Sequence, residues 1–109
     1  MATPTIEEAM LGLVNQFVPE KAKGIDLVIQ FLFTGEQTGN WYVTVKDQKV
    51  VVEAGKAAKA TATLSAKGTD YLQILTGQLD GTMAFMQGKI KSTGDMNALM
   101  KMQQIFKYK

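Results

Sequence analysis

Residues 25–53 have the sequence IDLVIQFLFTGEQTGNWYVTVKDQKVVVE, in which apolar residues recur at every second position. This spacing is typical of β-strands, whose side chains alternate between two faces. In residues 25–34 one face is mixed and the other is apolar, and the apolar face consists of Ile25, Leu27, Ile29, Phe31 and Phe33. Turns are expected at residues 35–39 and 47–48. The stretch therefore predicts three antiparallel strands joined as a meander, at residues 25–34, 41–46 and 49–53.

A helix is predicted before the meander, at residues 4–18. Its apolar residues lie three and four positions apart and form one stripe, which consists of Ile6, Ala9, Met10, Leu13, Val14 and Phe17. Two N-caps suit the sequence: Thr3, which a proline follows, or Thr5, which would form a capping box with Glu8. Pro19 is expected to end the helix. The stripe is expected to face the core, with membrane contact as the alternative if the helix loosens.

After the meander, a loop at residues 54–60 leads into alternating strands and helices. We first expect a strand at residues 61–66 and then a helix that is capped by Thr69 and closed by Gly77. A second short helix is expected from Asp80 through Met86, ending at Gly88. A strand at residues 89–93 and a helix that is capped by Asp95 and runs to about Phe106 complete the chain. The strand at residues 89–93 is expected at a sheet edge, because its lysines discourage further pairing. Residues 1–109 should form one α+β domain, with a five-stranded, mostly antiparallel sheet covered on one face by helices.

The residue types that are missing exclude many functions. The 109 residues include no Cys and no His, and all twelve basic residues are Lys. Disulfides, thiolate nucleophiles, Ser-His-Asp triads and zinc sites built from Cys or His are therefore excluded. The planar Arg side chain that grips phosphate or guanine at two points is absent as well. We expect neither a metal nor another cofactor.

Charge and hydropathy indicate the partners and the compartment. The net charge is only +2 and the lysines are spread along the chain, so no nucleic-acid partner is expected. The first residues, MATPT, lack the basic and apolar regions of a signal peptide. The longest nearly apolar stretch, residues 25–33, is much shorter than the ~18 residues of a membrane span. These features predict a soluble, cytoplasmic and monomeric protein.

Each candidate catalytic group has a structural explanation. Asp80 and Asp95 could form a carboxylate pair, but both stand at predicted helix starts, where capping accounts for them. Asp26 is expected on the solvent face of its strand. Lys49 and Glu53 suit a pair on a strand surface. Because no nucleophile is matched with a base, we expect that the protein is not an enzyme, and a carboxylate enzyme is the weaker alternative.

Methionine is the unusual apolar residue of this chain. Five of the seven fall within twenty residues, at Met83, Met86, Met96, Met100 and Met102. Methionine fills irregular gaps in cores, and its flexible, polarizable side chain also lines deformable apolar pockets. In the last predicted helix, Met102 and Ile105 widen the apolar stripe beyond what packing on one sheet face requires. Composition leaves both interpretations open.

Five segments carry a resemblance to a known family. They are FTG at residues 33–35, TGNWYVTV at 38–45, EAG at 53–55, ATATLS at 60–65 and, most specifically, GQLDGTMAFMQGKIKSTGD at 77–95. In this order they resemble the lipid-binding domain of sterol carrier protein type two, from about Ile6 to the C-terminus. The order of the predicted helices and strands is similar to that of the same family.

The resemblance implies a hydrophobic tunnel between the five-stranded sheet and the helices. It also implies loosely selective binding and transfer of fatty acids, fatty acyl-CoA, phospholipids or sterols, without chemistry. The partners would be a lipid ligand and, transiently, a membrane surface. From the residue pattern we expect Gln103 to meet the polar end of the lipid and the tunnel to be lined by Trp41, Leu75, Leu79, Met83, Met86, Leu99, Met102 and Phe106.

An alternative function is an accessory module that presents lipid to lipid-metabolising enzymes or docks with them. The chain ends KYK, so it lacks the Ser-Lys-Leu peroxisomal signal of many eukaryotic members. The N-terminus before the resemblance is too short for a fused enzyme, so we expect a stand-alone or bacterial-type member, or an excised domain.

Overall fold

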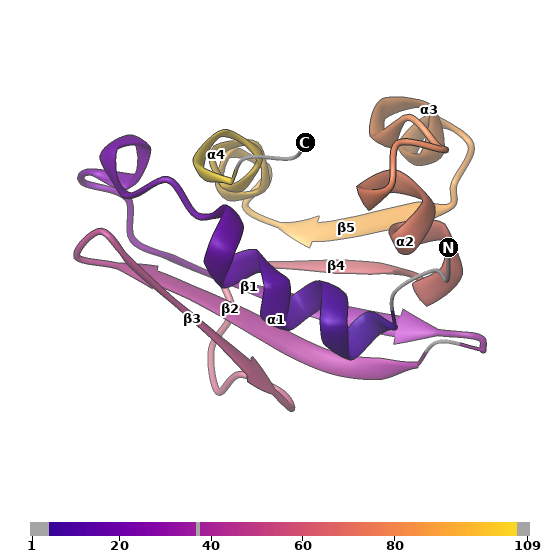
Figure 1. Ribbon diagram of the computed structural model, residues 1–109, viewed down its shortest axis with the longest axis horizontal. Coiled ribbons are helices and arrows are strands. Elements are labelled where there is room, and N and C mark those ends of the chain that lie inside the picture. The colour runs from indigo at the N-terminus through magenta and orange to yellow at the C-terminus, as the bar shows by residue number, and fades with distance from the viewer. Residues whose placement is uncertain (1–4, 37, 107–109) are drawn as a thin grey trace.

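The computed structural model describes residues 5–36 and 38–106, except for the side chain of Gln103. The elements follow in the order α1 (Ile6–Gln16), η1 (Pro19–Ala22, a 3₁₀ helix), β1 (Leu27–Thr34), β2 (Gly39–Lys46), β3 (Lys49–Ala54), β4 (Ala62–Lys67), α2 (Gly68–Leu75), α3 (Gly81–Met86), β5 (Ile90–Gly94) and α4 (Met96–Ile105). Figure 1 shows the helices gathered over one side of the sheet. The expected α+β class with a five-stranded sheet is confirmed.

β1 lies at the centre of the sheet, whose strand order is β3-β2-β1-β4-β5. It pairs antiparallel with β2 and parallel with β4, and the other two pairs are antiparallel. The register places Phe31 between Trp41 on one side and Leu64 on the other. β5 forms an edge of the sheet, as its lysines predict. The sheet is therefore mostly antiparallel, with one parallel pair at its centre.

The turn between β2 and β3 is the tight connection that the sequence predicts. Asp47 and Gln48 both have positive φ, at 54° and 59°. Two consecutive left-handed residues match the right-handed twist of a hairpin, and Asp tolerates this conformation well. The turn sets the register of the hairpin, in which Lys46 lies opposite Lys49.

The start of α1 is held by the second of the two predicted caps. The Thr5 hydroxyl accepts a hydrogen bond from the Glu8 amide at 3.1 Å. In return, the Glu8 carboxylate accepts one from the Thr5 amide at 2.8 Å. The capping box is therefore confirmed, whereas Thr3 lies outside the described residues.

The end of α1 differs from the prediction. The helix stops at Gln16 rather than at residue 18, and Phe17 takes an extended conformation. Phe17 forms an antiparallel bridge with Phe106, and their rings lie 5.7 Å apart. The Val18 amide donates to the carbonyl of Ile105 at 2.8 Å. A contact with the far end of the chain thus ends the helix before the proline does.

The core lies between the helices and the apolar face of the meander. The predicted face of β1 is buried from Leu27 to Phe33. α1 buries Met10 and Leu13 against it, so its stripe faces the core, although Val14 is exposed. The aromatic centre of this core is a cluster in which the Tyr71 ring lies 5.0 Å from that of Phe33 and 5.7 Å from that of Phe31.

The helices after β4 begin as predicted in two cases of three. Asp80 caps α3 by accepting from the Thr82 amide at 2.8 Å, and Asp95 caps α4 by accepting from the Asn97 amide at 2.9 Å. α2 instead begins at Gly68, with Lys67 as an N-cap that makes no side-chain hydrogen bond. The prediction that Thr69 caps this helix is therefore wrong, because β4 runs directly into α2 without a separate capping residue.

Gln30 is a buried polar residue on the face of the sheet opposite the helices. Its side-chain amide donates to the carbonyls of Trp41 at 2.9 Å and Gly55 at 3.1 Å. Its oxygen accepts from the Ala57 amide at 2.7 Å. These bonds hold the loop between β3 and β4 against the sheet and supply the hydrogen bonds that a buried amide needs. The position had only been predicted to lie on a mixed face.

In the ranges 5–36 and 38–106, the longest helix is α1 with 11 residues. No helix in this part of the chain has the length and apolar character to cross a membrane.

Gly94 is expected to be indispensable to the sheet. It has a φ of 92°, and a Cβ there would lie 2.7 Å from the Thr61 carbonyl oxygen and 2.9 Å from the Ala62 Cα. Both contacts are with backbone, so Gly94→Ala should lower the free energy of unfolding by about 3 kcal/mol. Gly12→Ala is the control, because nothing lies within 4 Å of its Cβ and its helical backbone should gain ~0.5 kcal/mol. Urea unfolding followed by circular dichroism measures the free energy of unfolding of both variants. Similar changes in the two variants would refute the prediction that the sheet requires glycine at position 94.

Candidate functional site

The candidate site is the apolar layer between the sheet and the helices. Phe31 and Ile29 of β1 line its floor, and both are fully buried. Leu13 of α1 covers one part and Ile105 of α4 another, again without exposure. Tyr71 of α2 closes the layer against the aromatic residues of β1. The layer thus brings together side chains from α1, α2, α4 and β1 in one continuous core.

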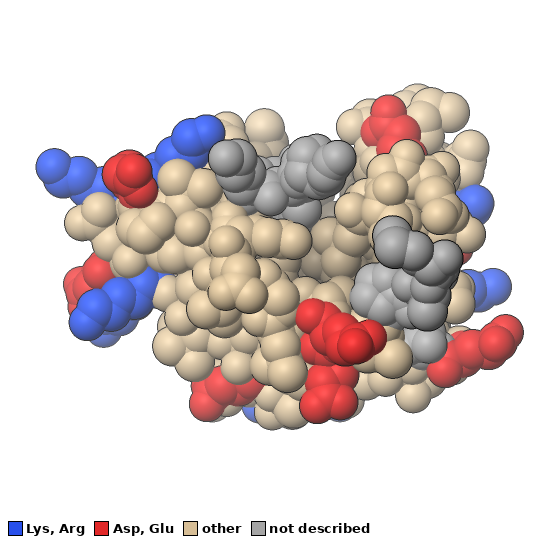
Figure 2. All heavy atoms as spheres, viewed as in Figure 1, with Lys and Arg blue, Asp and Glu red and all other residues tan. Residues whose placement is uncertain are grey.

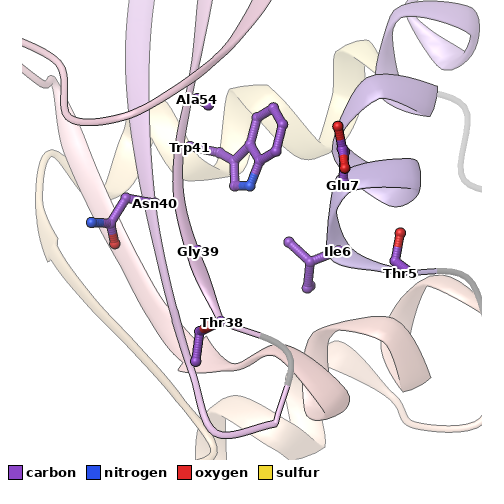
Figure 3. Close-up of a pocket in the computed structure, with 8 residues that line it drawn as sticks. All are labelled: Thr5, Ile6, Glu7, Thr38, Gly39, Asn40, Trp41 and Ala54. Carbon is purple, nitrogen blue, oxygen red and sulfur yellow. The ribbon is translucent and has the colours of Figure 1, made fainter.

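A groove of about 440 Å³ opens beside this layer, between the start of α1 and the start of β2. Figure 3 shows the Trp41 indole pointing from β2 into the groove, toward Ile6 and Glu7 of α1. Trp41 is partly buried and packs against the core, so it connects the groove with the apolar layer. The groove is lined by Thr5, Ile6, Glu7, Thr38, Gly39, Asn40, Trp41 and Ala54.

The absence of a side chain at Gly39 makes room for the indole. A Cβ at this position would lie 3.1 Å from Trp41 Nε1. Gly39 also has a φ of 154°, which side chains rarely adopt. The glycine therefore helps to keep the indole in the mouth of the groove.

Five of the nine predicted site residues lie in or against the core. Leu99 and Met102 of α4 and Phe106, its C-cap, are buried, and Leu75 of α2 is partly buried against the same core. Trp41 borders the same core from β2. The structure thus places these five residues around one apolar layer.

The other predicted site residues stand apart from this group. Met83 and Met86 of α3 are 49% and 76% exposed, because this six-residue helix turns only Ala84 inward. Leu79 is partly buried in the connection before α3. The side chain of Gln103 lies outside the described part of α4. Whether these residues line a tunnel stays a prediction.

Residues of α1 were missing from the predicted lining. Met10 and Leu13 are fully buried opposite the apolar face of β1 and complete the layer. The signal was present in the apolar stripe of residues 4–18, but the stripe had been assigned to ordinary core packing. The structure shows that core and candidate site are built from the same side chains.

The two aspartates considered as a carboxylate pair have structural roles. Asp80 and Asp95 each accept a backbone amide as helix caps. Within residues 5–36 and 38–106, no group of three His, Cys, Asp or Glu side chains is placed to hold a metal ion. A hydrogen bond to Glu53, with minor contributions from desolvation and from the same carboxylate's charge, raises the pKa of Tyr42. Tyr42 lies opposite Glu53 in the sheet, in the register next to Trp41.

Comparisons with known proteins identify relatives of this chain. The model of the SCP-2 sterol transfer family matches residues 9–107. A curated relative, hydroxysteroid dehydrogenase-like protein 2 of Xenopus tropicalis, is 36% identical over 99 residues, which cover 90% of this chain and 23% of the relative. The chain thus spans about a quarter of the length of the curated relative.

Solved structures share the fold. Palmitated sterol carrier protein 2-like 2 from Aedes aegypti is 26% identical, with a TM-score of 0.72, and the match covers 96% of this chain and 94% of that one. A stereoselective inverting sec-alkylsulfatase from Pseudomonas sp. is 22% identical, with a TM-score of 0.82, over 95% of this chain and 16% of that one. The fold therefore occurs both as a whole small protein chain and as a small part of a longer enzyme chain.

The position of Trp41 can be tested through Gly39. Gly39→Ala should push the indole out of the groove, shift its fluorescence emission to longer wavelength and increase quenching by acrylamide. Trp41 is the chain's single tryptophan, so the signal reports on this position alone. Gly24→Ala is the matched control, because it too has positive φ but nothing lies within 4 Å of its Cβ. Equal emission spectra of the two folded variants would contradict the described geometry.

Proposed function

The chain belongs to the SCP-2 sterol transfer family, and on this premise we propose that it binds a lipid between its sheet and helices and carries it without chemical change. The ligand class is a fatty acid, a fatty acyl-CoA, a phospholipid or a sterol. The observation that carries the proposal is the single apolar layer built from α1, α2, α4 and β1. A family relative of nearly the same length has been solved in palmitated form, which supports an acyl chain as ligand.

The energetics of an acyl chain in such a layer are favourable. At about 0.8 kcal/mol per buried CH₂, a sixteen-carbon chain supplies roughly 12 kcal/mol of gross transfer free energy. Immobilising the chain and ordering the protein consume much of this. A micromolar or tighter dissociation constant, which corresponds to about 8 kcal/mol, therefore remains within reach.

We place the acyl chain under α4, with Trp41 at the entrance. Leu99, Met102 and Phe106 would move aside to admit it, and Leu75 would flank it. Met102 is suited to this role because an unbranched thioether repacks at little cost. Leu79 and Gln103 would lie toward the polar end of the lipid. Release would follow loosening of α4, whose end is tied to α1 by the Phe17–Phe106 bridge.

Transfer also requires transient contact with a membrane surface, and α3 supplies a suitable apolar face. Met83, Phe85 and Met86 expose between 49% and 76% of their surface. On α4, Met96 and Met100 are exposed as well. Large apolar side chains exposed on one short helix are candidates for such a contact, because contiguous exposed apolar patches mark membrane or protein interaction sites. The α3 residues that were expected to line the tunnel would on this view meet the lipid at the membrane.

A second candidate function is an accessory module that presents lipid to an enzyme. The observation that favours it is the coverage of the relatives: this chain corresponds to 23% of a dehydrogenase-like protein and 16% of a sec-alkylsulfatase. The two functions share one binding layer. They differ in whether a lipid-metabolising enzyme stays bound to the protein in a pull-down.

Lipid entry beside Trp41 should be visible in its fluorescence. Brominated palmitate should quench the emission in a saturable way, because bromine quenches only on close approach, whereas palmitate itself should compete and restore the signal. Native mass spectrometry of the purified protein, followed by organic extraction, identifies any lipid retained. The proposal fails if brominated palmitate quenches Trp41 no more than it quenches free tryptophan and no lipid class binds or co-purifies.

Shortening Met102 should create space that a lipid can fill. Met102→Ala should lower the free energy of unfolding by about 3 kcal/mol, because the side chain is buried. At a palmitate concentration a hundred times the dissociation constant of the wild type, the wild type should be stabilised by about 2.7 kcal/mol. At the same concentration the Met102→Ala variant should be stabilised by more. Met100→Ala, on the exposed side of α4, should change stability by less than ~0.5 kcal/mol and leave the palmitate effect unchanged. Equal palmitate stabilisation of the two variants would exclude the layer under α4 as the site.

A further inference from the structure

Three lysines converge at the end of the sheet where β4 ends and β5 begins. Lys91 follows from the register, since it lies opposite Ser65 in the β4–β5 pair. Lys67 lies two positions after Ser65 in β4 and therefore on the same face, because side chains alternate along strands. Lys89 directly precedes β5 and lines the same groove. The intervening residue Ala66 is buried on the helix side. Ser65, Lys67 and Lys91 therefore share the face opposite the lipid layer, and Lys89 borders them.

These lysines are not neutralised. All three are exposed, and in the described ranges none forms an ion pair. Like charges on neighbouring strands disfavour the pairing that brings them together. Figure 2 shows the basic side chains at the two ends of the molecule, with mainly uncharged and acidic surface between them. The cluster is therefore a local positive site on a chain whose net charge is only +2.

A groove of about 610 Å³ lies among the lysines. Its lining adds hydroxyl groups from Thr34 and Ser65, which can donate hydrogen bonds to an anion. The acidic member of the lining is Asp70. A second carboxylate, Glu36, follows Gly35 in the turn after β1, and a Cβ added to Gly35 would lie 3.9 Å from the Lys67 side chain. The full lining is Thr34, Ser65, Ala66, Lys67, Asp70, Gly88, Lys89 and Lys91.

We propose that this groove binds a phosphate group that carries two negative charges. Three ammonium groups and one carboxylate leave an excess charge of about +2, which suits a phosphate monoester better than the single charge of a fatty-acid carboxylate. Lysine acts on phosphate as a point charge and needs no planar geometry. The site is separate from the lipid layer and does not depend on it. The phosphate could belong to a lipid headgroup at a membrane or to a free small molecule.

The probe is methyl phosphate, titrated into ¹⁵N-labelled protein at constant ionic strength with chloride as the reference anion. We expect saturable amide shifts confined to the residues around Ser65, Lys67 and Lys91. Binding should weaken as the pH falls below about 6, where the phosphate becomes a monoanion. Dimethyl phosphate, a monoanion throughout, should bind less tightly than methyl phosphate at neutral pH.

A matched pair of double variants tests the residues. Lys89→Gln with Lys91→Gln should weaken methyl phosphate binding about tenfold or more. Lys46→Gln with Lys49→Gln removes the same charge from an exposed, cross-strand pair at the turn between β2 and β3 and should leave the affinity unchanged. Both variants should still give saturable quenching of Trp41 by brominated palmitate. Loss of that quenching in the wild type would refute the lipid proposal without affecting this one.

Vesicles distinguish the two sources of phosphate. If vesicles of phosphatidylcholine with phosphatidic acid bind the protein more than phosphatidylcholine alone, and the Lys89/Lys91 variant loses the difference, the group is a lipid headgroup. If methyl phosphate binds but the vesicles show no difference, the group belongs to a soluble molecule. The proposal is overturned if methyl phosphate shifts no more amides than chloride, or if the two double variants lose affinity equally.

Discussion

The pairing of β1 with a neighbour on each side is the constraint on which the rest of the structure depends. β1 is antiparallel to β2 and parallel to β4, so the chain must leave β3 and cross the sheet before β4 can begin. Gln30, in the middle of β1, binds that crossing segment through the carbonyl of Gly55 and the amide of Ala57. The same strand presents Phe31 and Phe33 to the helices on its other face. One strand thus organises both the crossover and the apolar layer.

Local patterns predicted most of the elements, and long-range contacts account for the errors. Alternation placed the strands, and the helix caps at Asp80 and Asp95 were visible because capping involves residues only two or three positions apart. The early end of α1 was not visible, because Phe17 leaves the helix to pair with Phe106. The buried state of Gln30 was also hidden, since its partners lie in a loop that no periodicity describes.

The candidate site was predictable only in part. The sequence pattern of a helix reveals its apolar residues, but it does not reveal which other elements those residues pack against. Leu99 and Met102 were expected at the apolar layer, and α4 buries them there. Met83 and Met86 carried the same compositional signal, yet α3 is too short for its spacing to indicate which face turns inward. The lysines at the end of the sheet are far apart in the sequence. Only the register of β4 and β5 shows that they form one cluster.

The bridge between Phe17 and Phe106 also has a consequence for biosynthesis. It joins the C-terminal end of α1 to the C-terminal end of α4. The two rings contact each other, and the Val18 amide donates a hydrogen bond to the Ile105 carbonyl. During translation, α1 and the meander emerge long before α4 exists, so the apolar face that α4 covers is open while the chain is on the ribosome. The native layer can close only after Phe106 has left the exit tunnel, and until then the apolar face that α4 covers stays exposed.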